Sequence, residues 1–365
     1  MMINRLKNSS LYHKFFHWEY WPFPVFYFPV FFYWLWLSLK SRSFFFFSAS
    51  NPSIKSGGML GESKFSILEK IAPEFKPATI LVEAPATRAV LESRLKTAGI
   101  TFPLIAKPDI GERGWLVEKI TNWAALEDYF TQVQGNFIIQ AFVDFPVELG
   151  VFYYRFPSQK QGHISSIVVK DFLKVKGDGH STILELIEKY PRARFQRVAL
   201  QEKHPHLMGE ILADGKELEL VPIGNHCKGT TFLNGNQWIN AQLVRVFDEI
   251  SRPIQGFYFG RFDLRCTSIE DLYAGQNIRI VELNGAGAEP GHIYQPGFSI
   301  IEAYRVIFSH WRIMYQISQL NNAAGNPYMT LREGRAIFAD YQNFKQVNSV
   351  RRETVAPTPL HTQLT

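Results

Sequence analysis

The chain has 365 residues, of which 46% are hydrophobic, and a formal net charge of +6. This length allows one large domain or two small ones. The Lys and Arg residues are scattered rather than clustered, so nucleic acid is not expected as a partner. Only two cysteines occur, Cys227 and Cys266, and they form no CxxC pair, so neither a zinc site nor a disulfide framework is expected.

Residues 1–50 contain a high concentration of aromatic side chains. No charged residue lies in the stretch 21–39, and a run of four phenylalanines, 44–47, follows soon after it. A membrane-spanning helix needs about 20 apolar residues, but three prolines interrupt the first half of this stretch. Because Trp and Tyr favour the membrane interface, we interpret residues 1–50 as a kinked segment inserted in a membrane or lying on it. This interpretation predicts a lipid surface as a partner and a position at the cytoplasmic face of a membrane. A buried aromatic arm or a dimer interface is the alternative.

Residues 51–63 are rich in Gly and Ser and are predicted to be a linker. The chain then alternates short helical and strand-like patterns as far as residue 320. Helices are expected at Phe65–Ile71, Thr87–Ala98, Trp123–Val133 and Ser299–Leu320. Strands are expected at Ile80–Glu83, Phe102–Lys107, Phe137–Val143, Val147–Phe156 and Ile164–Val169. Capping boxes at Thr182–Glu185 and Thr330–Glu333 predict helix starts. Residues 321–365 are expected to form a C-terminal helix followed by a disordered tail.

Two later strand-like runs each carry a pair of polar side chains. Arg261 and Asp263 lie on one face of the first run because side chains alternate along a strand, and Glu282 and Asn284 lie on one face of the second. If the two strands are neighbours, Asp263, Glu282 and Asn284 form a cluster of oxygen ligands beside a guanidinium group. Such ligands suit Mg²⁺. The alternative is that both strands simply expose polar ends to water.

The order of these features resembles the ATP-grasp superfamily. The features are Lys64, a strand that ends at Lys107 before a glycine loop, Gln140 with Glu148, the Arg261–Asp263 pair and the Glu282–Asn284 pair. The likeness is greatest to D-alanine–D-alanine ligases and to the central part of cyanophycin synthetase, and it covers about residues 64–296. It implies an α/β fold in which two α+β lobes close over ATP. The ATP-grasp domain would be 64–320, with an N-lobe at 64–140 and a C-lobe at 141–320.

The resemblance also implies roles for individual residues. ATP would be bound by Lys64, Lys107, Gly111, Arg113, Gly114, Gln140 and Glu148. Mg²⁺ would be held by Asp263, Glu282 and Asn284. Arg261 and a lid lysine would be catalytic, with Lys174 chosen as the lid lysine and Lys170 as the alternative. The relatives usually carry serines where this chain has Glu112 and Arg113, and often a carboxylate where it has Gln140.

The implied activity is that of a ligase dependent on ATP and Mg²⁺. A carboxylate takes the γ-phosphate of ATP to give an acylphosphate, and an amine or another nucleophile then attacks the acyl carbon. D-Alanine ligases carry a further domain before the first lysine, where this chain has the aromatic segment, so the two substrates do not carry over. Glu289, in the loop after Asn284, is a candidate partner for an amine acceptor, unless this loop is only a solvated turn. Two alternatives remain open for the whole protein: a membrane-bound nucleotide-binding module without ligase activity, and a membrane adaptor that shares only the fold.

Overall fold

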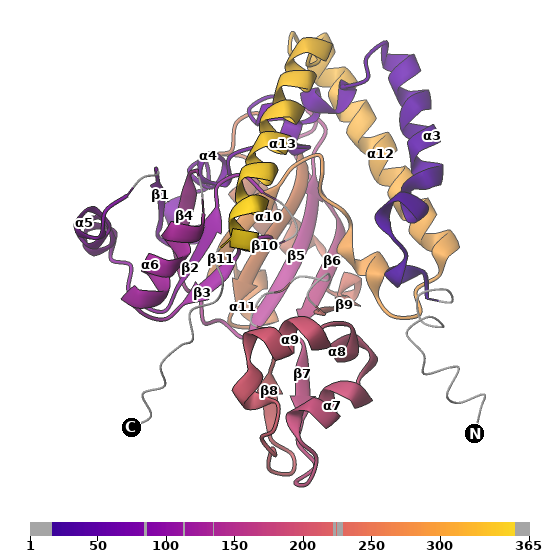
Figure 1. The fold of residues 1–365 in the computed structure, drawn as a ribbon. Coiled ribbons are helices and arrows are strands. Elements are labelled where there is room, and N and C mark those ends of the chain that lie inside the picture. Colours follow the sequence, from indigo (N-terminus) through magenta and orange to yellow (C-terminus); the bar gives the residue numbers. More distant parts are fainter. Residues whose placement is uncertain are drawn as a thin grey trace.

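The structure is a computed structural model, and it describes residues 17–83, 86–111, 114–133, 135–221, 224 and 229–354. Its strands form a four-stranded sheet, a five-stranded sheet and a small two-stranded sheet, and all of the pairings are antiparallel. In Figure 1 the four-stranded sheet lies to the left of the five-stranded sheet, and two long helices lie to the right. This mixed arrangement of α and β elements agrees with the α/β class expected from the sequence; the sheets are called N-lobe and C-lobe below after the expected domains.

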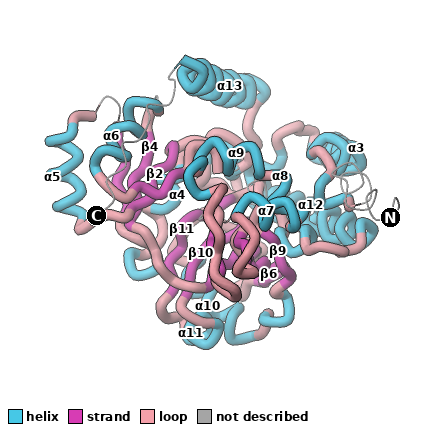
Figure 2. The backbone as a smooth tube through the Cα atoms, turned by 60° about the horizontal axis from the view of Figure 1, so that its bottom comes forward, coloured by secondary structure: helices cyan, strands magenta, loops and turns pink. Residues whose placement is uncertain are grey.

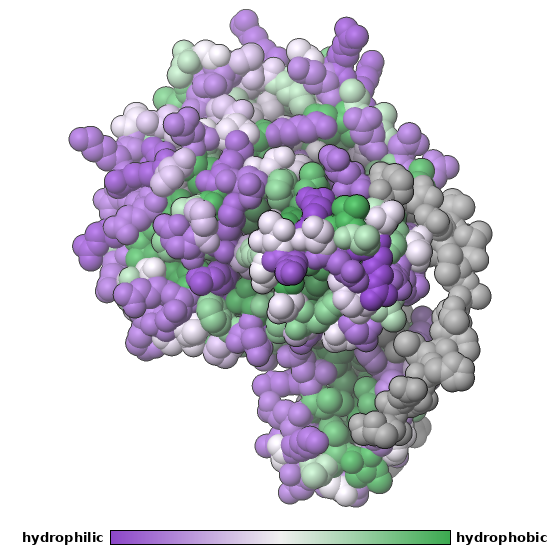
Figure 3. Space-filling model, turned by 90° about the vertical axis from the view of Figure 1, so that its left-hand side faces the viewer, coloured by the Kyte–Doolittle hydropathy of each residue, from purple (hydrophilic) through white to green (hydrophobic). Residues whose placement is uncertain are grey.

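The four-stranded sheet is the core of the N-lobe. Its strands, in spatial order, are β1 (Thr79–Val82), β4 (Phe137–Ala141), β2 (Leu104–Pro108) and β3 (Glu118–Ile120). Helices α5 (Arg88–Ala98) and α6 (Trp123–Gln132) cover one face of the sheet and bury Leu91 and Leu126 with it. Strand alternation puts Leu104 and Ala106 in this core, so Ile105 and Lys107 point to the opposite face. Figure 3 shows the molecule from the left-hand side of Figure 1, where α5 lies, and the surface there is mostly hydrophilic.

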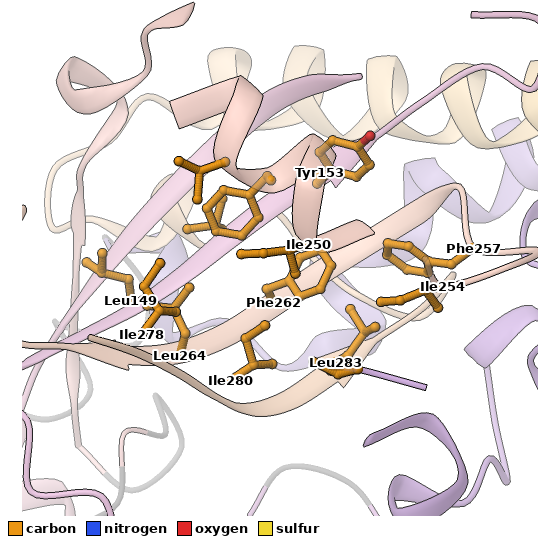
Figure 4. Packing of buried hydrophobic residues seen from close by; sticks show 14 of the residues in the cluster. Leu149, Tyr153, Ile250, Ile254, Phe257, Phe262, Leu264, Ile278, Ile280 and Leu283 are labelled. Carbon is orange, nitrogen blue, oxygen red and sulfur yellow. The ribbon is translucent and has the colours of Figure 1, made fainter. Parts of the chain in front are cut away.

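The five-stranded sheet is the core of the C-lobe. Its strands, in spatial order, are β11 (Ile278–Asn284), β10 (Phe259–Cys266), β5 (Val147–Tyr154), β6 (His163–Asp171) and β9 (Thr231–Asn234). Helices α10 (Ala241–Ser251) and α11 (Ile269–Ala274) pack on one face. Figure 4 shows the apolar side chains of β5, β10 and β11, such as Phe262 and Ile280, close to Ile250 of α10. The polar residues of β10 therefore lie on the opposite face, toward the N-lobe.

A small unit with its own apolar core follows β6 in the chain. It consists of β7 (Lys174–Lys176), α7 (Ile183–Lys189), α8 (Pro191–Phe195), α9 (Arg197–Lys203) and β8 (Glu217–Glu219). The predicted capping box is confirmed at the start of α7, where Thr182 and Glu185 bond each other's backbone N–H groups. The unit lies below the five-stranded sheet in Figure 1 and comes forward in Figure 2.

The aromatic N-terminal segment contains α3 (Phe23–Ser41), which packs along α12 (Ile300–Ala323), as Figure 1 and Figure 2 show. Phe26 stacks on Tyr304 with ring centroids 5.2 Å apart, and the Tyr304 hydroxyl donates to the Phe26 carbonyl at 2.9 Å. The opposite side of α3 exposes large apolar side chains, so the helix has one packed face and one open face. Within the described residues, none of the helices combines the length and the hydropathy needed to cross a bilayer.

Residues 51–63 are built into the C-lobe, where the sequence indicated a linker. The side chain of Asn51 is fully buried; it donates to the Phe259 carbonyl at 2.8 Å and accepts from the Phe259 N–H at 2.9 Å. Gly57 and Gly58 accept hydrogen bonds at 2.9 Å from the backbone of Ala286 and Gly287, in the loop after β11. A Cβ at Gly58 would lie 2.8 Å from the backbone of Gly285, which explains why glycine is needed at this close approach. The Gly and Ser content that suggested flexibility therefore serves close backbone packing.

The C-terminal part also differs from expectation. Helix α13 (Leu331–Thr354) continues past Asn348, where the sequence indicated the start of a disordered tail. Its predicted capping box is confirmed, since Thr330 and Glu333 exchange hydrogen bonds between side chain and backbone. Residues 355–365 lie outside the described part of the chain.

Candidate active site between the lobes

A cavity of about 640 Å³ lies between the two large sheets. It is lined by residues from β2 and β4 of the N-lobe and from β10 and β11 of the C-lobe. Ten of the residues chosen from the sequence line it: Lys64, Lys107, Gly111, Gly114, Gln140, Glu148, Arg261, Asp263, Glu282 and Asn284. Pockets of this size are typical for small-molecule ligands.

The acidic part of the cavity comes from the pairing of β10 with β11. Arg261 lies opposite Asn284 and Asp263 lies opposite Glu282, so all four side chains share one face. The register shifts after Asp263, where Leu264 pairs with Ile280 and Val281 is left out of the pairing. This β-bulge changes the face of the sheet to which the following side chains point. Without it, strict alternation would put Glu282 on the same face as Ile280, in the apolar core. The bulge therefore places Glu282 in the cavity.

Asp263 is the centre of a buried polar network. The Arg261 guanidinium donates to both oxygens of Asp263, at 2.8 and 2.9 Å, and the Asn284 amide donates to Oδ2 at 3.1 Å. Lys170 Nζ lies 3.6 Å from Oδ1. Burial alone would raise the pKa of Asp263, but Arg261 and Lys170 outweigh burial and hold this pKa below its usual value. Asp263 is therefore a carboxylate at neutral pH.

Lys107 connects the two lobes across the cavity. Its ammonium group donates to the Val281 carbonyl at the bulge, at 2.9 Å, and to Gln140 Oε1 at 3.3 Å. The side chain is buried; burial lowers the pKa of Lys107 to about 8, and Glu282 opposes that shift. A pKa near 8 still leaves Lys107 mostly protonated at pH 7. It is thus a poorly solvated cation that can bind an anion strongly.

The residues around Lys64 form the N-lobe side of the cavity. Helix α4 (Lys64–Leu68) is fixed by Asp109, whose side chain accepts from the Phe65 N–H at 2.9 Å and from Ser63 Oγ at 3.0 Å. Lys64 Nζ donates to the Gly111 carbonyl in the glycine loop. Gly111 and Gly114 line the cavity, but Arg113, the third residue chosen in this loop, lies outside the described part of the chain.

The structure brings Lys170 to the cavity and leaves Lys174 away from it. Lys170 Nζ is 3.2 Å from Glu148 Oε1, and Asp263 and Glu148 keep the pKa of Lys170 raised although burial lowers it. Lys174 is exposed and pairs with Glu217 at 2.9 Å, and it is not among the described residues that line the cavity. Of the two candidates for the lid lysine, Lys170 is therefore the one that lines the cavity, and Lys174 is not brought to it.

Arg265 also lines the cavity, although it was not among the residues chosen from the sequence. It lies on the same face of β10 as Asp263, two residues further on, and donates from Nε to Glu148 Oε2 at 2.9 Å. Glu148, expected to bind ribose, thus has an ion-pair partner on each oxygen, Lys170 and Arg265. The strand period that selected Asp263 would also have selected Arg265.

The other end of the cavity is aromatic, and the N-terminal segment forms part of it. Trp18, Trp21, Phe23, Phe26 and Tyr27 line this end, as do residues of α12. The hydroxyls of Tyr27 and Tyr294 both donate to Oε1 of Glu289, with a distance of 3.2 Å for Tyr294. The carbonyl of Glu289 accepts from Arg261 at 3.0 Å. Glu289 is therefore held between the aromatic end and the acidic network.

The acidic residues fit a magnesium ion. In the described part of the chain no group of three or more His, Cys, Asp and Glu side chains is placed to hold a metal. Asp263 and Glu282, however, face each other across the strand pair, with the Asn284 amide beside Asp263. Mg²⁺ commonly binds through one or two carboxylates together with substrate phosphates. Two carboxylates and an amide, opposite lysines that suit phosphate, satisfy that requirement.

Replacing Lys107 with alanine is expected to weaken ATP binding about tenfold or more, because a hydrogen bond from a charged group contributes about 1.5–3 kcal/mol. Calorimetric titration with ATP and Mg²⁺ measures the change. Lys96 is a suitable control, since it lies at an exposed position on α5 and is not among the described residues that line the cavity, and Lys96→Ala should leave the affinity unchanged. Equal ATP affinity for the Lys107 variant and the unmodified protein would exclude Lys107 from phosphate binding.

The chain was also compared with known proteins. No family model matches it, and no curated protein sequence matches it. Among solved structures, it is similar to the VanG D-Ala:D-Ser ligase from Enterococcus faecalis, with 12% identity, a TM-score of 0.39, and coverage of 73% of this chain and 63% of that one. It is similar to the D-alanine–D-alanine ligase from Bacillus anthracis, with 12% identity, a TM-score of 0.41, and coverage of 74% and 71%.

A third similar structure is the bifunctional glutathione synthetase from Pasteurella multocida, with 11% identity, a TM-score of 0.34, and coverage of 68% of this chain and 36% of that one. These three proteins are ATP-grasp enzymes, the superfamily that the motifs of this chain resemble. The chain spans less than two thirds of the length of the VanG ligase and of the glutathione synthetase. We therefore base the proposed function on the side chains of the cavity.

Proposed function

We propose that the protein is a ligase that uses ATP and Mg²⁺ to join a carboxylate to an amine or another nucleophile through an acylphosphate. The observation that supports this most directly is the arrangement of charges in one cavity: Lys64, Lys107 and Lys170 lie around the pair of acidic residues Asp263 and Glu282. Lysines suit the phosphates of ATP, and the two carboxylates suit the metal ion that accompanies them.

The chain's own residues position the reactants. Lys64, beside the glycine loop, and Lys107 are placed to bind phosphate oxygens, while Asp263, Glu282 and Asn284 would hold Mg²⁺. When bound, the metal supplies positive charge that neutralises the phosphates during transfer. Arg261 keeps Asp263 oriented through two hydrogen bonds and presents a fixed cation beside the reacting carboxylate. The attack of the acid on the γ-phosphate gives ADP and the acylphosphate, and attack of the nucleophile on the acyl carbon then releases phosphate.

The experiment that tests this function measures ADP release by the full chain with ATP, Mg²⁺ and mixtures of carboxylic acids and amines. ADP release that requires both an acid and an amine is expected. The variant Arg261→Lys keeps the positive charge but cannot donate two parallel hydrogen bonds, so its turnover should fall. ATP binding without any acid-dependent ADP release would instead identify a nucleotide-binding module.

We further propose that the open face of α3 lies on a lipid bilayer at the cytoplasmic side. This face exposes Phe28, Phe31, Phe32, Trp36 and Leu39, each more than half exposed. Contiguous exposed apolar side chains on a folded protein mark an interaction surface. Aromatic residues suit the membrane interface, and the basic residues at 40 and 42, at the end of α3, suit anionic headgroups.

Replacing Phe28, Phe31 and Trp36 together with serine is expected to weaken binding to vesicles of phosphatidylcholine and phosphatidylglycerol about tenfold or more, because the apolar area that can enter the interface is lost. Co-sedimentation with the vesicles measures it. Phe338→Ser on α13, where Phe338 is 55% exposed, is the matched control. Unchanged vesicle binding by the triple variant would contradict a membrane role, and a dimer that this variant disrupts would assign the face to a second copy of the chain.

A further inference from the structure

The aromatic end of the cavity indicates which class of substrate the protein binds. The part around Lys64 and Lys107 indicates only where phosphate binds. Trp18, Phe26 and Tyr27 from the N-terminal segment meet Trp311 and Met314 from α12 around this end. A ligand that covers such a surface gains about 25 cal/mol of binding free energy for each Å² of apolar area removed from water. This surface is continuous with the polar part of the cavity, so a ligand that extends from the reacting centre in this direction meets apolar side chains.

A carboxylate, that of Glu289, lies at the boundary between the aromatic and polar parts, and the carboxylates of Glu19 and Glu62 also line the cavity. Glu289 lines the cavity, and both phenols that hold it, Tyr27 and Tyr294, donate to the same oxygen, Oε1. The two phenols do not use Oε2. The side chain of Glu289 is therefore fixed in orientation while one of its oxygens is left to other partners. A carboxylate held in this way at an apolar boundary suits a cationic group.

The aromatic end also contains a polar atom that lacks a partner. His310 lines the cavity, packs on the Phe152 ring with centroids 4.5 Å apart, and is 7% exposed. Its Nδ1 is buried and makes no hydrogen bond to any described residue. Burial lowers the pKa of His310 to about 3, so the imidazole is neutral. The neutral imidazole adds a weakly polar contact to the mainly apolar surface of this end of the cavity. Such a surface suits a mostly apolar ligand.

From these features we infer that the nucleophile is an amphiphilic primary amine, whose ammonium group pairs with Glu289 and whose apolar part lies against the aromatic end of the cavity. This inference rests on the proposed ligase function. It also gives the N-terminal segment a part in substrate binding, because Tyr27 and Trp18 belong to it. The ammonium group gives one proton to the Glu289 carboxylate, and the free amine attacks the acyl carbon of the acylphosphate. A C–N bond forms, the C–O bond to phosphate breaks, and the second proton of the nitrogen leaves with the phosphate.

The test uses the full chain with ADP and Mg²⁺, and calorimetry with butylamine and octylamine as probes. Each methylene that becomes buried strengthens binding about fourfold, so octylamine, with four more methylenes, should bind about 250-fold more tightly if all four are buried. Glu289→Gln should weaken octylamine binding about tenfold and leave octanol binding unchanged. Phe23 lines the aromatic end and is 47% exposed, and Phe23→Ala should reduce the ratio of the octylamine affinity to the butylamine affinity. The control Phe338→Ala should leave this ratio unchanged.

Equal affinities for butylamine and octylamine would overturn the inference, as would octylamine binding that is the same in the Glu289→Gln variant. These outcomes are distinguishable from a failure of the proposed function. If ADP binds with Mg²⁺ and Lys107→Ala weakens that binding, the nucleotide site stands and only the class of amine is wrong. If ADP does not bind, the ligase function fails whatever the amines do.

Discussion

Glu282→Ala is expected to remove the Mg²⁺-dependent part of ATP binding and to lower turnover about a hundredfold or more, since a metal ion contributes several kcal/mol of charge stabilisation to phosphoryl transfer. Glu282 faces Asp263 across the strand pair and points into the cavity, so it is one of the two carboxylates that would hold the ion. Titration with ATP in the presence and absence of Mg²⁺, together with ADP release, measures both effects.

The same substitution should change stability little. Glu282 is only partly buried, and its removal leaves the buried contacts of Asp263 with Arg261 and Lys170 in place. Glu270→Ala, at an exposed position on α11, on the other face of the sheet, serves as the control for the loss of a carboxylate. If the Glu282 variant keeps both its Mg²⁺ dependence and its turnover, the metal site is not at these strands.

Removing residues 1–50 is expected to unfold the protein or make it insoluble. In the described part of this segment, six large apolar side chains are buried against the rest of the chain: Trp18, Phe26, Val30, Leu37, Phe46 and Phe47. Burying one large apolar side chain contributes about 1.5–3 kcal/mol, so together they account for a share comparable to the whole stability of a domain, about 5–15 kcal/mol. The deletion would also uncover Ile307 and Met314 of α12.

Circular dichroism and thermal unfolding of the shortened chain measure this effect. The control is the full chain with Phe28→Ser, which changes only the open face of α3, where Phe28 is 64% exposed. A shortened chain that stays soluble, folded and able to bind ATP would show that the segment is an appended anchor rather than part of the fold. The membrane role would then be its main role.

The sequence predicted the strands of the site well because a period of two is a strong local signal. Arg261, Asp263, Glu282 and Asn284 meet as expected. The bulge at Val281 was not predicted, although the run carries a sign of it. Ile278 and Ile280 are apolar whereas Glu282, at the next alternate position, is polar, so the phase of the alternation changes between them. The same local period could not separate Lys170 from Lys174, because these residues differ by an even number of positions. Their separation arises where the chain leaves β6 after Asp171 and enters the small unit at β7.

The N-terminal segment shows a second limit of sequence analysis. Its aromatic residues indicated either a membrane element or a buried arm, and composition alone does not say which side of a helix is covered. In the structure one side of α3 packs on α12, as the interpretation as a buried arm expects, and the other side is exposed. The membrane role of the exposed side stays a proposal. The contribution of Tyr27 to the cavity depends on contacts with Glu289, which is 262 positions away, and no local pattern encodes such a contact.

The Lys107 ammonium group donates a hydrogen bond to the Val281 carbonyl at the bulge, and this bond holds the two lobes together. Lys107 belongs to β2 of the N-lobe, and the carbonyl it contacts belongs to β11 of the C-lobe. A phosphate that binds Lys107 competes with that carbonyl, so nucleotide entry exchanges a bond between the lobes for a bond to the ligand. The amide protons next to Val281 should therefore exchange with solvent at different rates in the free and nucleotide-bound protein. Under the proposed function, binding of ATP is thereby expected to be coupled to the freedom of the two lobes to move apart.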